Sequence, residues 1–421
     1  MTTSTTQKIT RYWPLRVQEY LACVCCIGMV AGMLFSRGLL SVSMIVMVLN
    51  ALHPATLQES WARCRGNRFA LFSLLFFLSY AVSGFWSQDI GNWSRILQIK
   101  LPFLFLPFAF INAPLHEVRL QRYTIYGILL TLLGGMVYSI SFLVADPGYF
   151  SVNPHLPSPL EGDYIRFTIA LVLGLHLIFY LFSEKNSFLL KGAEKALLVL
   201  WSVAAIAYIH IQAAKSGMLC LYLLIIIYIV ARYIRKRPGL GFAFLFLLGA
   251  ASIIGGMTIP SIKSQVKNIV KEQKMWESNN TAQFNNASSF VPRLISYKVA
   301  LELIRDQPLT GVGTGDVKAE IDKKYKAEYP GMSEYFRLIP HNQFIFTALV
   351  VGIPLSLLLV LLVFAPLMRQ TRNVYTVATL MIMFVGLSIE PMLEVQNGVF
   401  VYLFFTLFWM AVFKRDTQTL P

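Results

Sequence analysis

Twelve apolar segments constrain this chain of 421 residues more than any other feature. A helix that crosses a membrane needs about 17–25 mostly apolar residues, and most of the segments approach this length. We therefore predict an all-α polytopic membrane protein with about twelve transmembrane helices. The first two segments are short and closely spaced, so they form either a helical hairpin or one kinked element. The segments lie near residues 19–35, 38–53, 69–85, 96–112, 123–145, 164–182, 195–212, 216–232, 240–259, 341–367, 374–390 and 396–413.

The overall composition supports a protein that lies in lipid. Hydrophobic residues make up 56% of the chain and charged residues only 14%, whereas soluble domains carry about 25% charged residues. Of the five cysteines, none lies between residues 260 and 340, so we expect no disulfide in that stretch. No Cys/His or Asp/Glu spacing typical of a metal site is present either. The sequence therefore predicts neither a metal nor a cofactor.

Basic residues gather in alternate connections between the apolar segments, and this pattern predicts the orientation of the chain. The densest cluster is Arg232, Arg235, Lys236 and Arg237. By the positive-inside rule, both termini and the basic connections face the cytoplasm. The net charge of +15 is then a signature of topology, and we do not predict nucleic-acid binding. The opposite connections carry acids instead: Asp89, Asp146, Glu161, Asp163, Glu390 and Glu394.

One long polar loop, residues 260–340, divides the chain into an N-terminal bundle (1–259), the loop itself and a C-terminal bundle (341–421). Within the loop we predict an amphipathic helix over 261–276. This helix either lies on an anionic membrane surface or packs, solvated, on the scaffold. An Asn/Ser-rich linker (279–289) and a helix over 292–306 follow. The glycine-rich run 311–316 lacks the Gly-Lys-Ser/Thr of a phosphate loop, so it predicts a structural turn before a third helix over 316–329.

Two residues of this loop are candidates for chemistry. Arg293 lies in the first turn of the predicted helix 292–306, where the helix N-terminus already favours anions; the alternative is a plain surface arginine. His341 follows Pro340 and opens the next apolar segment. An imidazole there can accept a proton near neutral pH; the alternative is a helix-start histidine bonded to the backbone.

Further cations lie on the same predicted side. Lys215 occupies a very short turn between two apolar segments, where a charge held near the membrane tends to mark a site. Arg166 opens the segment near 164–182, and Arg95 lies just before the segment near 96–112. All three could face one shared cavity. For Arg95 and Arg166 the alternative is that the side chain extends to lipid headgroups.

These residues stand in an ordered set of motifs that resembles the O-antigen ligase superfamily, which includes O-antigen ligases, O-antigen polymerases and protein O-oligosaccharyltransferases. The similarity is confined to the loop and the segment after it. The chain departs from the family in having Lys215 where a second arginine is usual, and in lacking an acid within 347–352. The motifs are Val291-Pro292-Arg293-Leu294, Ala300-Leu301-Glu302-Leu303-Ile304, Pro308-Leu309-Thr310-Gly311-Val312-Gly313 and Pro340-His341-Asn342-Gln343-Phe344.

The resemblance implies a glycosyltransferase C-like scaffold in the bacterial inner membrane, with a large helical loop on the periplasmic side and no metal. It also implies an undecaprenyl-diphosphate-linked glycan as donor and lipid A–core as acceptor. In that reaction Arg293 and Lys215, with Arg166 and Arg95 as helpers, would bind the diphosphate. His341 would be the base for the attacking hydroxyl. Polymerase and protein-glycosylating activities stay open, and the alternative from another class is a transporter or flippase for lipid-linked glycans.

Overall fold

The computed structural model describes residues 13–54, 56–115, 117–149, 155–160, 162–183, 188–234, 236–258, 260–277, 290–368 and 373–413. Within these ranges every regular element is a helix and no strand occurs. The predicted all-α class is therefore confirmed. The linker predicted over 279–289 lies outside the described residues.

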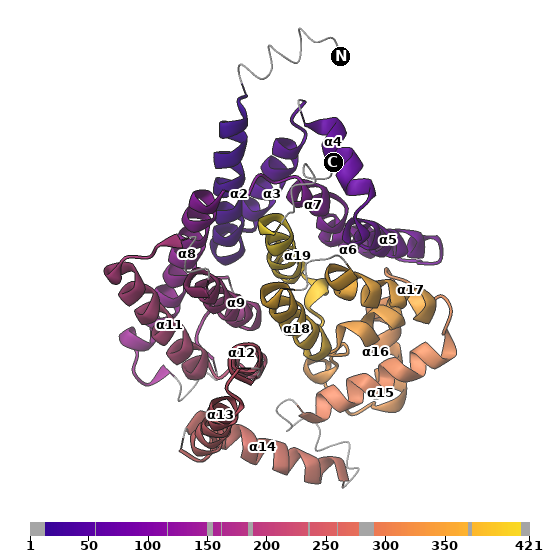
Figure 1. The fold of residues 1–421 in the computed structure, drawn as a ribbon. Coiled ribbons are helices and arrows are strands. Elements are labelled where there is room, and N and C mark those ends of the chain that lie inside the picture. Colours follow the sequence, from indigo (N-terminus) through magenta and orange to yellow (C-terminus); the bar gives the residue numbers. More distant parts are fainter. Residues whose placement is uncertain are drawn as a thin grey trace.

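The helices follow the twelve predicted segments closely (Figure 1). A short helix, α4, was not predicted, and the fourth segment is divided into α6 and α7. The N-terminal part contains α2 (Leu15–Phe35), α3 (Arg37–Ala51), α4 (Leu57–Arg65), α5 (Arg68–Val82), α6 (Ile90–Lys100), α7 (Pro102–Ile111), α8 (Val118–Ala145), α9 (Tyr164–Ser183), α11 (Gly192–Gln212), α12 (Lys215–Ile229) and α13 (Pro238–Thr258). The loop contains α14 (Pro260–Glu277), α15 (Phe290–Asp306) and α16 (Val317–Glu328), and the C-terminal part contains α17 (Gln343–Met368), α18 (Val374–Ile389) and α19 (Gln396–Val412).

Length and composition mark this chain as a polytopic membrane protein. Among the described residues, eight helical stretches are long and apolar enough to cross a membrane, and four shorter apolar helices accompany them. Together they correspond to the twelve predicted segments. The first two segments form a hairpin, because α2 and α3 pack against each other. The helical conformation is interrupted at Ser36, whose side chain accepts a hydrogen bond from the N–H of Leu39.

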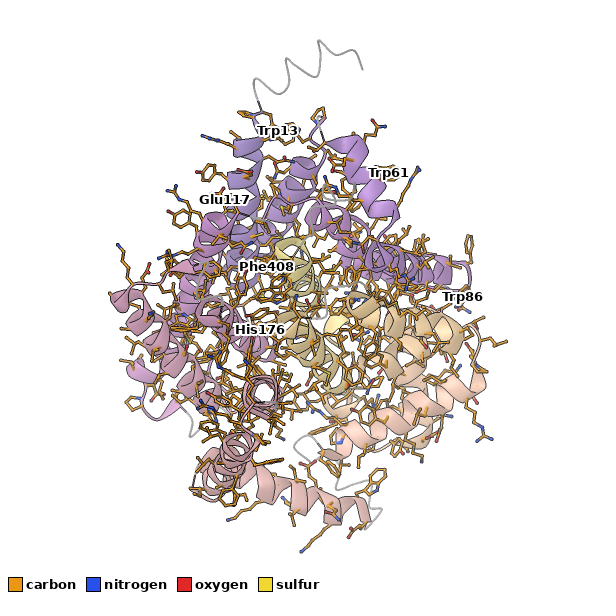
Figure 2. All side chains as sticks on the ribbon, viewed as in Figure 1. Trp13, Trp61, Trp86, Glu117, His176 and Phe408 are labelled. Atoms are coloured by element: carbon orange, nitrogen blue, oxygen red, sulfur yellow. The ribbon has the colours of Figure 1, made fainter. Side chains whose placement is uncertain are left out.

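Helix α19 forms the centre of the bundle and packs on α7, α9 and α18. All of its residues except Gln396 and Met410 are buried. Figure 2 shows Phe408 of α19 and His176 of α9 inside the bundle, whereas Trp61 lies at its edge. The outer helices expose large apolar side chains instead, and this is the pattern of a surface that faces lipid. Examples are Leu130 (69% exposed), Leu200 (65%) and Phe246 (76%).

His176 is a satisfied core histidine. Its Nε2 lies 3.0 Å from the carbonyl oxygen of Tyr375, and the hydroxyl of Tyr228 lies 2.9 Å from its Nδ1. Its ring also meets Trp409 edge-on. Both ring nitrogens therefore have partners, as a buried polar side chain requires, and the residue joins α9 to α12, α18 and α19.

The glycine-rich turn docks the loop onto a break in α17. The backbone N–H groups of Val312 and Gly313 donate to the carbonyl oxygens of Leu349 and Val350, at 2.9 and 3.0 Å. Directly after these carbonyls, Gly352 leaves the helical conformation with φ 82° and ψ 164°. Gly311 has φ 64°, and a Cβ there would lie 2.5 Å from the carbonyl oxygen of Leu349. The predicted structural turn is thus confirmed, and the reason for glycine is close backbone approach.

A buried ion pair fastens α6 to the segment between α18 and α19. The Lys100 ammonium is fully buried and pairs with Glu394 at 2.9 Å. Gln343 at the start of α17 donates to the same carboxylate at 2.7 Å and accepts from the N–H of Leu393, also at 2.7 Å. Lys100 also lies over the ring of Tyr80, 4.6 Å from its centroid. A buried charge is tolerated only when it is paired and hydrogen-bonded in this way.

We predict that Gly311→Ala destabilises the protein, because alanine at this positive φ is strained and its Cβ would press on the α17 backbone. The expected loss is about 1–3 kcal/mol, measured as a lower Tm of the detergent-solubilised protein. Gly331→Ala is the matched control, since a Cβ at Gly331 meets nothing within 4 Å. Equal melting temperatures for the two variants would contradict the docking role of the turn.

Candidate functional site

A buried carboxylate joins the two residues that the sequence marks most strongly. Glu390 follows the last residue of α18; its Oε1 accepts from Nη2 of Arg293 and its Oε2 lies against Nδ1 of His341, both at 3.1 Å. The Glu390 side chain is only 5% exposed, whereas that of Arg293 is 33% and that of His341 20% exposed. The acid is therefore hidden behind a cation and an imidazole that both remain open to a ligand.

The position of His341 follows from its neighbour in the chain. The side-chain oxygen of Asn342 accepts from the N–H groups of Phe344 and Ile345, at 2.9 and 3.1 Å, and so caps the start of α17. Its amide nitrogen donates to the carbonyl oxygen of Ser388 at 2.9 Å. One asparagine thus fixes the start of α17 against the end of α18, two residues before Glu390.

The imidazole itself bonds a carboxylate and not the backbone, so the alternative of a helix-start histidine bonded to the backbone is wrong. In the part of the chain that the structure describes, the backbone of His341 takes part through its carbonyl oxygen, which accepts from the hydroxyl of Tyr297 at 2.9 Å. Burial raises the pKa of Tyr297, while nearby Arg293 lowers it and Glu390 raises it. A carboxylate at Nδ1 favours the tautomer protonated there, which leaves the lone pair of Nε2 to accept a proton.

Arg293 lies in the first turn of α15, as predicted, but the helix N-terminus is already occupied. Glu272 of α14 is 2% exposed, and its Oε2 accepts from the N–H groups of Phe290 and Val291 at 2.7 and 2.9 Å. The expected anion site at the helix end is therefore satisfied by a carboxylate of the chain itself. The guanidinium of Arg293, rather than the helix N-terminus, is what this region offers to a ligand.

The packing of α14 shows how the apolar face of the predicted amphipathic helix is covered. Helix α14 packs on α13 and α15, and among its described side chains, those of residues 267–277, Glu272 and Met275 are buried. The predicted apolar residues Ile269 and Val270 are 39% and 50% exposed. An acid and a methionine thus anchor the described part of the helix, while the side chains of Ile269 and Val270 are left uncovered by the rest of the chain.

Lys215 belongs to the same region. It is the first residue of α12, directly after the predicted short turn, in which Ala213 has φ 51°. Its exposed side chain is close enough to Arg293 to be repelled by it and to Glu272 to be attracted by it. The structure therefore places Lys215, at the start of α12, near Arg293 of α15, which shares Glu390 with His341 just before α17.

His155 and Tyr164 lie near the charged residues of the site, and sequence analysis missed them. The two rings stack with centroids 4.2 Å apart, and Nδ1 of His155 lies 3.1 Å from the carbonyl oxygen of Gln212. Burial lowers the pKa of His155, the hydrogen bond to Gln212 raises it, and the ammonium of Lys215 lowers it further. Since the pKa of His155 is lowered, we expect it to be neutral at pH 7.

The other two predicted cations are placed differently. Arg166 pairs with Asp163 at 2.8 Å, and Asp163 in turn accepts from Asn397 at 2.5 Å. Arg166 therefore lies at the edge of the region, held by an acid. The Arg95 side chain donates to Asn92 at 2.8 Å and lines a separate cavity beside α3.

Glu390 is the main residue that sequence analysis did not single out. It was counted only as one of several acids in the connections on the predicted outer side. Its position directly after an apolar helix and before Pro391 was the available signal, because a carboxylate at the end of a span must find a partner. Nothing in the sequence showed that the partner would be two residues, 97 and 49 positions earlier in the chain.

The comparisons with known proteins agree with this geometry. The search of curated proteins found no match for the chain. A family model described as O-Antigen ligase matches residues 197–360, a stretch that contains Lys215, Arg293 and His341 and ends before Glu390. This part of the chain is therefore similar to the O-antigen ligase family, in agreement with the resemblance of its motifs.

Proposed function

We propose that this protein is a metal-independent, inverting glycosyltransferase that moves a glycan from a polyprenyl-diphosphate donor to an acceptor hydroxyl. The specific activity we propose is transfer of O-antigen to lipid A–core on the periplasmic side of the bacterial inner membrane. The observation that carries this proposal is the buried carboxylate of Glu390, which holds a guanidinium and an imidazole at 3.1 Å each. The match of residues 197–360 to the O-antigen ligase family model supports the same class of reaction.

The leaving group of this reaction is a diphosphate, and the site offers it positive charge. Arg293 uses one of its five N–H donors for Glu390, so the others can bind phosphate oxygens. Lys215 adds a second positive charge beside it. As the bond between the anomeric carbon and the phosphate oxygen breaks, its electron pair goes to the diphosphate. The cations stabilise the charge that develops there, which is the contribution a metal makes in other phosphate chemistry.

The attacking group is an acceptor hydroxyl, and His341 is placed to activate it. Nε2 takes the hydroxyl proton while the oxygen attacks the anomeric carbon on the face opposite the diphosphate, so the configuration inverts. The imidazolium formed in this step lies against the Glu390 carboxylate, which stabilises its charge. Glu390 thus serves both halves of the reaction, because it orients the base and the phosphate-binding guanidinium at once.

We predict that His341→Ala and Arg293→Ala separate transfer from donor binding. His341→Ala should lower the transfer rate about 10²- to 10⁴-fold while donor binding is retained, because only the base is lost. Arg293→Ala should weaken donor binding about 10- to 100-fold, as expected for loss of a charged hydrogen bond. Transfer is measured with purified protein and a lipid-linked glycan, and Lys298→Ala on the exposed face of α15 is the control. Wild-type transfer by His341→Ala would refute the assignment of the base.

We also predict that Glu390→Gln lowers the transfer rate roughly 10²-fold or more. The amide keeps the size of the side chain but loses the charge that orients His341 and stabilises its protonated form. The rate is compared with that of Glu334→Gln, an exposed position in the long loop 260–340. A Glu390→Gln variant that folds and transfers glycan like Glu334→Gln would show that the carboxylate has only a structural role.

The acceptor can be identified from the lipopolysaccharide of a strain that lacks the protein. We predict rough core together with accumulated undecaprenyl-linked polymer, because a missing ligase leaves the polymer on its carrier. Mass analysis of the core and of the lipid-linked pool measures both species. Core capped with a single repeat unit would indicate a polymerase instead, and intact lipopolysaccharide with a lost protein glycan would indicate protein O-glycosylation.

A further inference from the structure

A second cavity lies away from the residues of the candidate site. It has a volume of about 590 Å³ and runs between α3 on one side and α6 and α7 on the other. This volume falls in the range of small-molecule binding sites, about 300–1,000 Å³. The cavity is open to the surface of the bundle, and Ile45 of its lining is 59% exposed.

The lining changes from polar to apolar along the cavity. Arg95 and Gln98 are the first lining residues along α6, and Ser41 is the first along α3. Farther along the two helical walls the lining becomes apolar, ending near Leu49 of α3 and Phe105 of α7. Ser41 and Leu49 are eight residues apart on one helix, which corresponds to about 12 Å. A molecule that fits this cavity has a polar, anionic end and an apolar chain.

The polar end of the cavity is connected to the candidate site through one short segment. Gln396 lines the cavity, and its side chain donates to the hydroxyl of Ser41 at 2.9 Å. Six residues earlier the same segment carries Glu390. Between them, Glu394 is paired with the buried Lys100. The segment is therefore fixed in place, with the site at one end and the head of the cavity at the other.

We propose that this cavity binds an acyl chain of a phosphorylated membrane lipid, with the lipid phosphate at Arg95. The guanidinium of Arg95 is exposed and uses one N–H donor for Asn92, so further donors can bind phosphate. The apolar walls supply the surface that an acyl chain buries.

The second part of the inference rests on the proposed function: this lipid is the acceptor. The donor diphosphate is assigned to Arg293 and Lys215, so a lipid with its phosphate at Arg95 is a second substrate beside the same segment.

Native mass spectrometry of the purified protein tests the lipid site without reference to catalysis. The probes are phosphatidylglycerol and phosphatidylcholine with identical acyl chains. We expect wild-type protein to retain phosphatidylglycerol preferentially. Arg95→Gln should weaken that retention about fivefold, the effect of one basic charge near a membrane surface. Ile45→Trp, which fills the cavity, should reduce retention of both lipids.

Two control variants make this test specific. Leu200→Trp places the same bulk on an exposed residue of α11, and Arg305→Gln removes an exposed arginine of α15. Both should retain lipid as the wild type does. Equal retention of the two lipids by wild type, unchanged by Arg95→Gln and Ile45→Trp, would overturn the proposal and identify the cavity as ordinary lipid-facing surface.

Kinetics in proteoliposomes then test the acceptor assignment. Arg95→Gln and Ile45→Trp should raise KM for the acceptor lipid about fivefold or more, with KM for the donor unchanged, and the control variants should change neither. A rise in donor KM alone would overturn the acceptor assignment. If wild-type protein transferred no glycan but showed the predicted lipid retention, the proposed function would fail while the lipid site would stand.

Discussion

The burial of one carboxylate, Glu390, determines how the candidate site is assembled. A carboxylate that is 5% exposed must be paired, because an isolated buried charge costs several kcal/mol. Its two oxygens take two different partners, Arg293 and His341, so α15, α17 and α18 meet at one point. The remaining contacts of the region follow from this meeting. Asn342 fixes α17 against α18, and Glu272 satisfies the N-terminus of α15.

The segment after Glu390 repeats the same principle four residues later. Glu394 is also removed from water, and it is held by Lys100 and Gln343. Gln343 lies two residues after His341. Glu390 therefore holds the first residue of this short stretch, and Glu394 holds the last. Two paired charges in a short segment resist displacement more than apolar packing alone would, because moving either acid would leave a buried charge without its partner. His341, the base on the proposed function, is therefore set in position before any substrate binds.

The sequence predicted the helices and turns well, but it did not predict which distant side chains pair with each other, and the reason is physical. Apolar length and turn residues are local, so the twelve apolar segments, the turn at 311–316 and the first-turn position of Arg293 could be predicted. The pairing of Arg293 with Glu390 spans 97 residues, and no local pattern encodes it. For the same reason Glu272 was expected only as part of an amphipathic helix, although it caps α15 from 18 residues away. Arg95 and Arg293 are both arginines on the same predicted side. Only the packing of the helices shows that Arg95 lines a separate cavity, whereas Arg293 lies in the candidate site.

The difference between positions 215 and 293 follows from what each cation must do. Arg293 has to hold Glu390 and, on the proposed function, a phosphate at the same time, which requires several donors in a fixed plane. A lysine there could not serve both partners with the same geometry. Lys215 lies beside Glu272 and Arg293 and supplies mainly charge, so a compact ammonium is sufficient. Together Lys215 and Arg293 offset the charges of Glu272 and Glu390. The site is therefore close to neutral, and on the proposed function the diphosphate leaving group meets cations that are already oriented by carboxylates rather than by water.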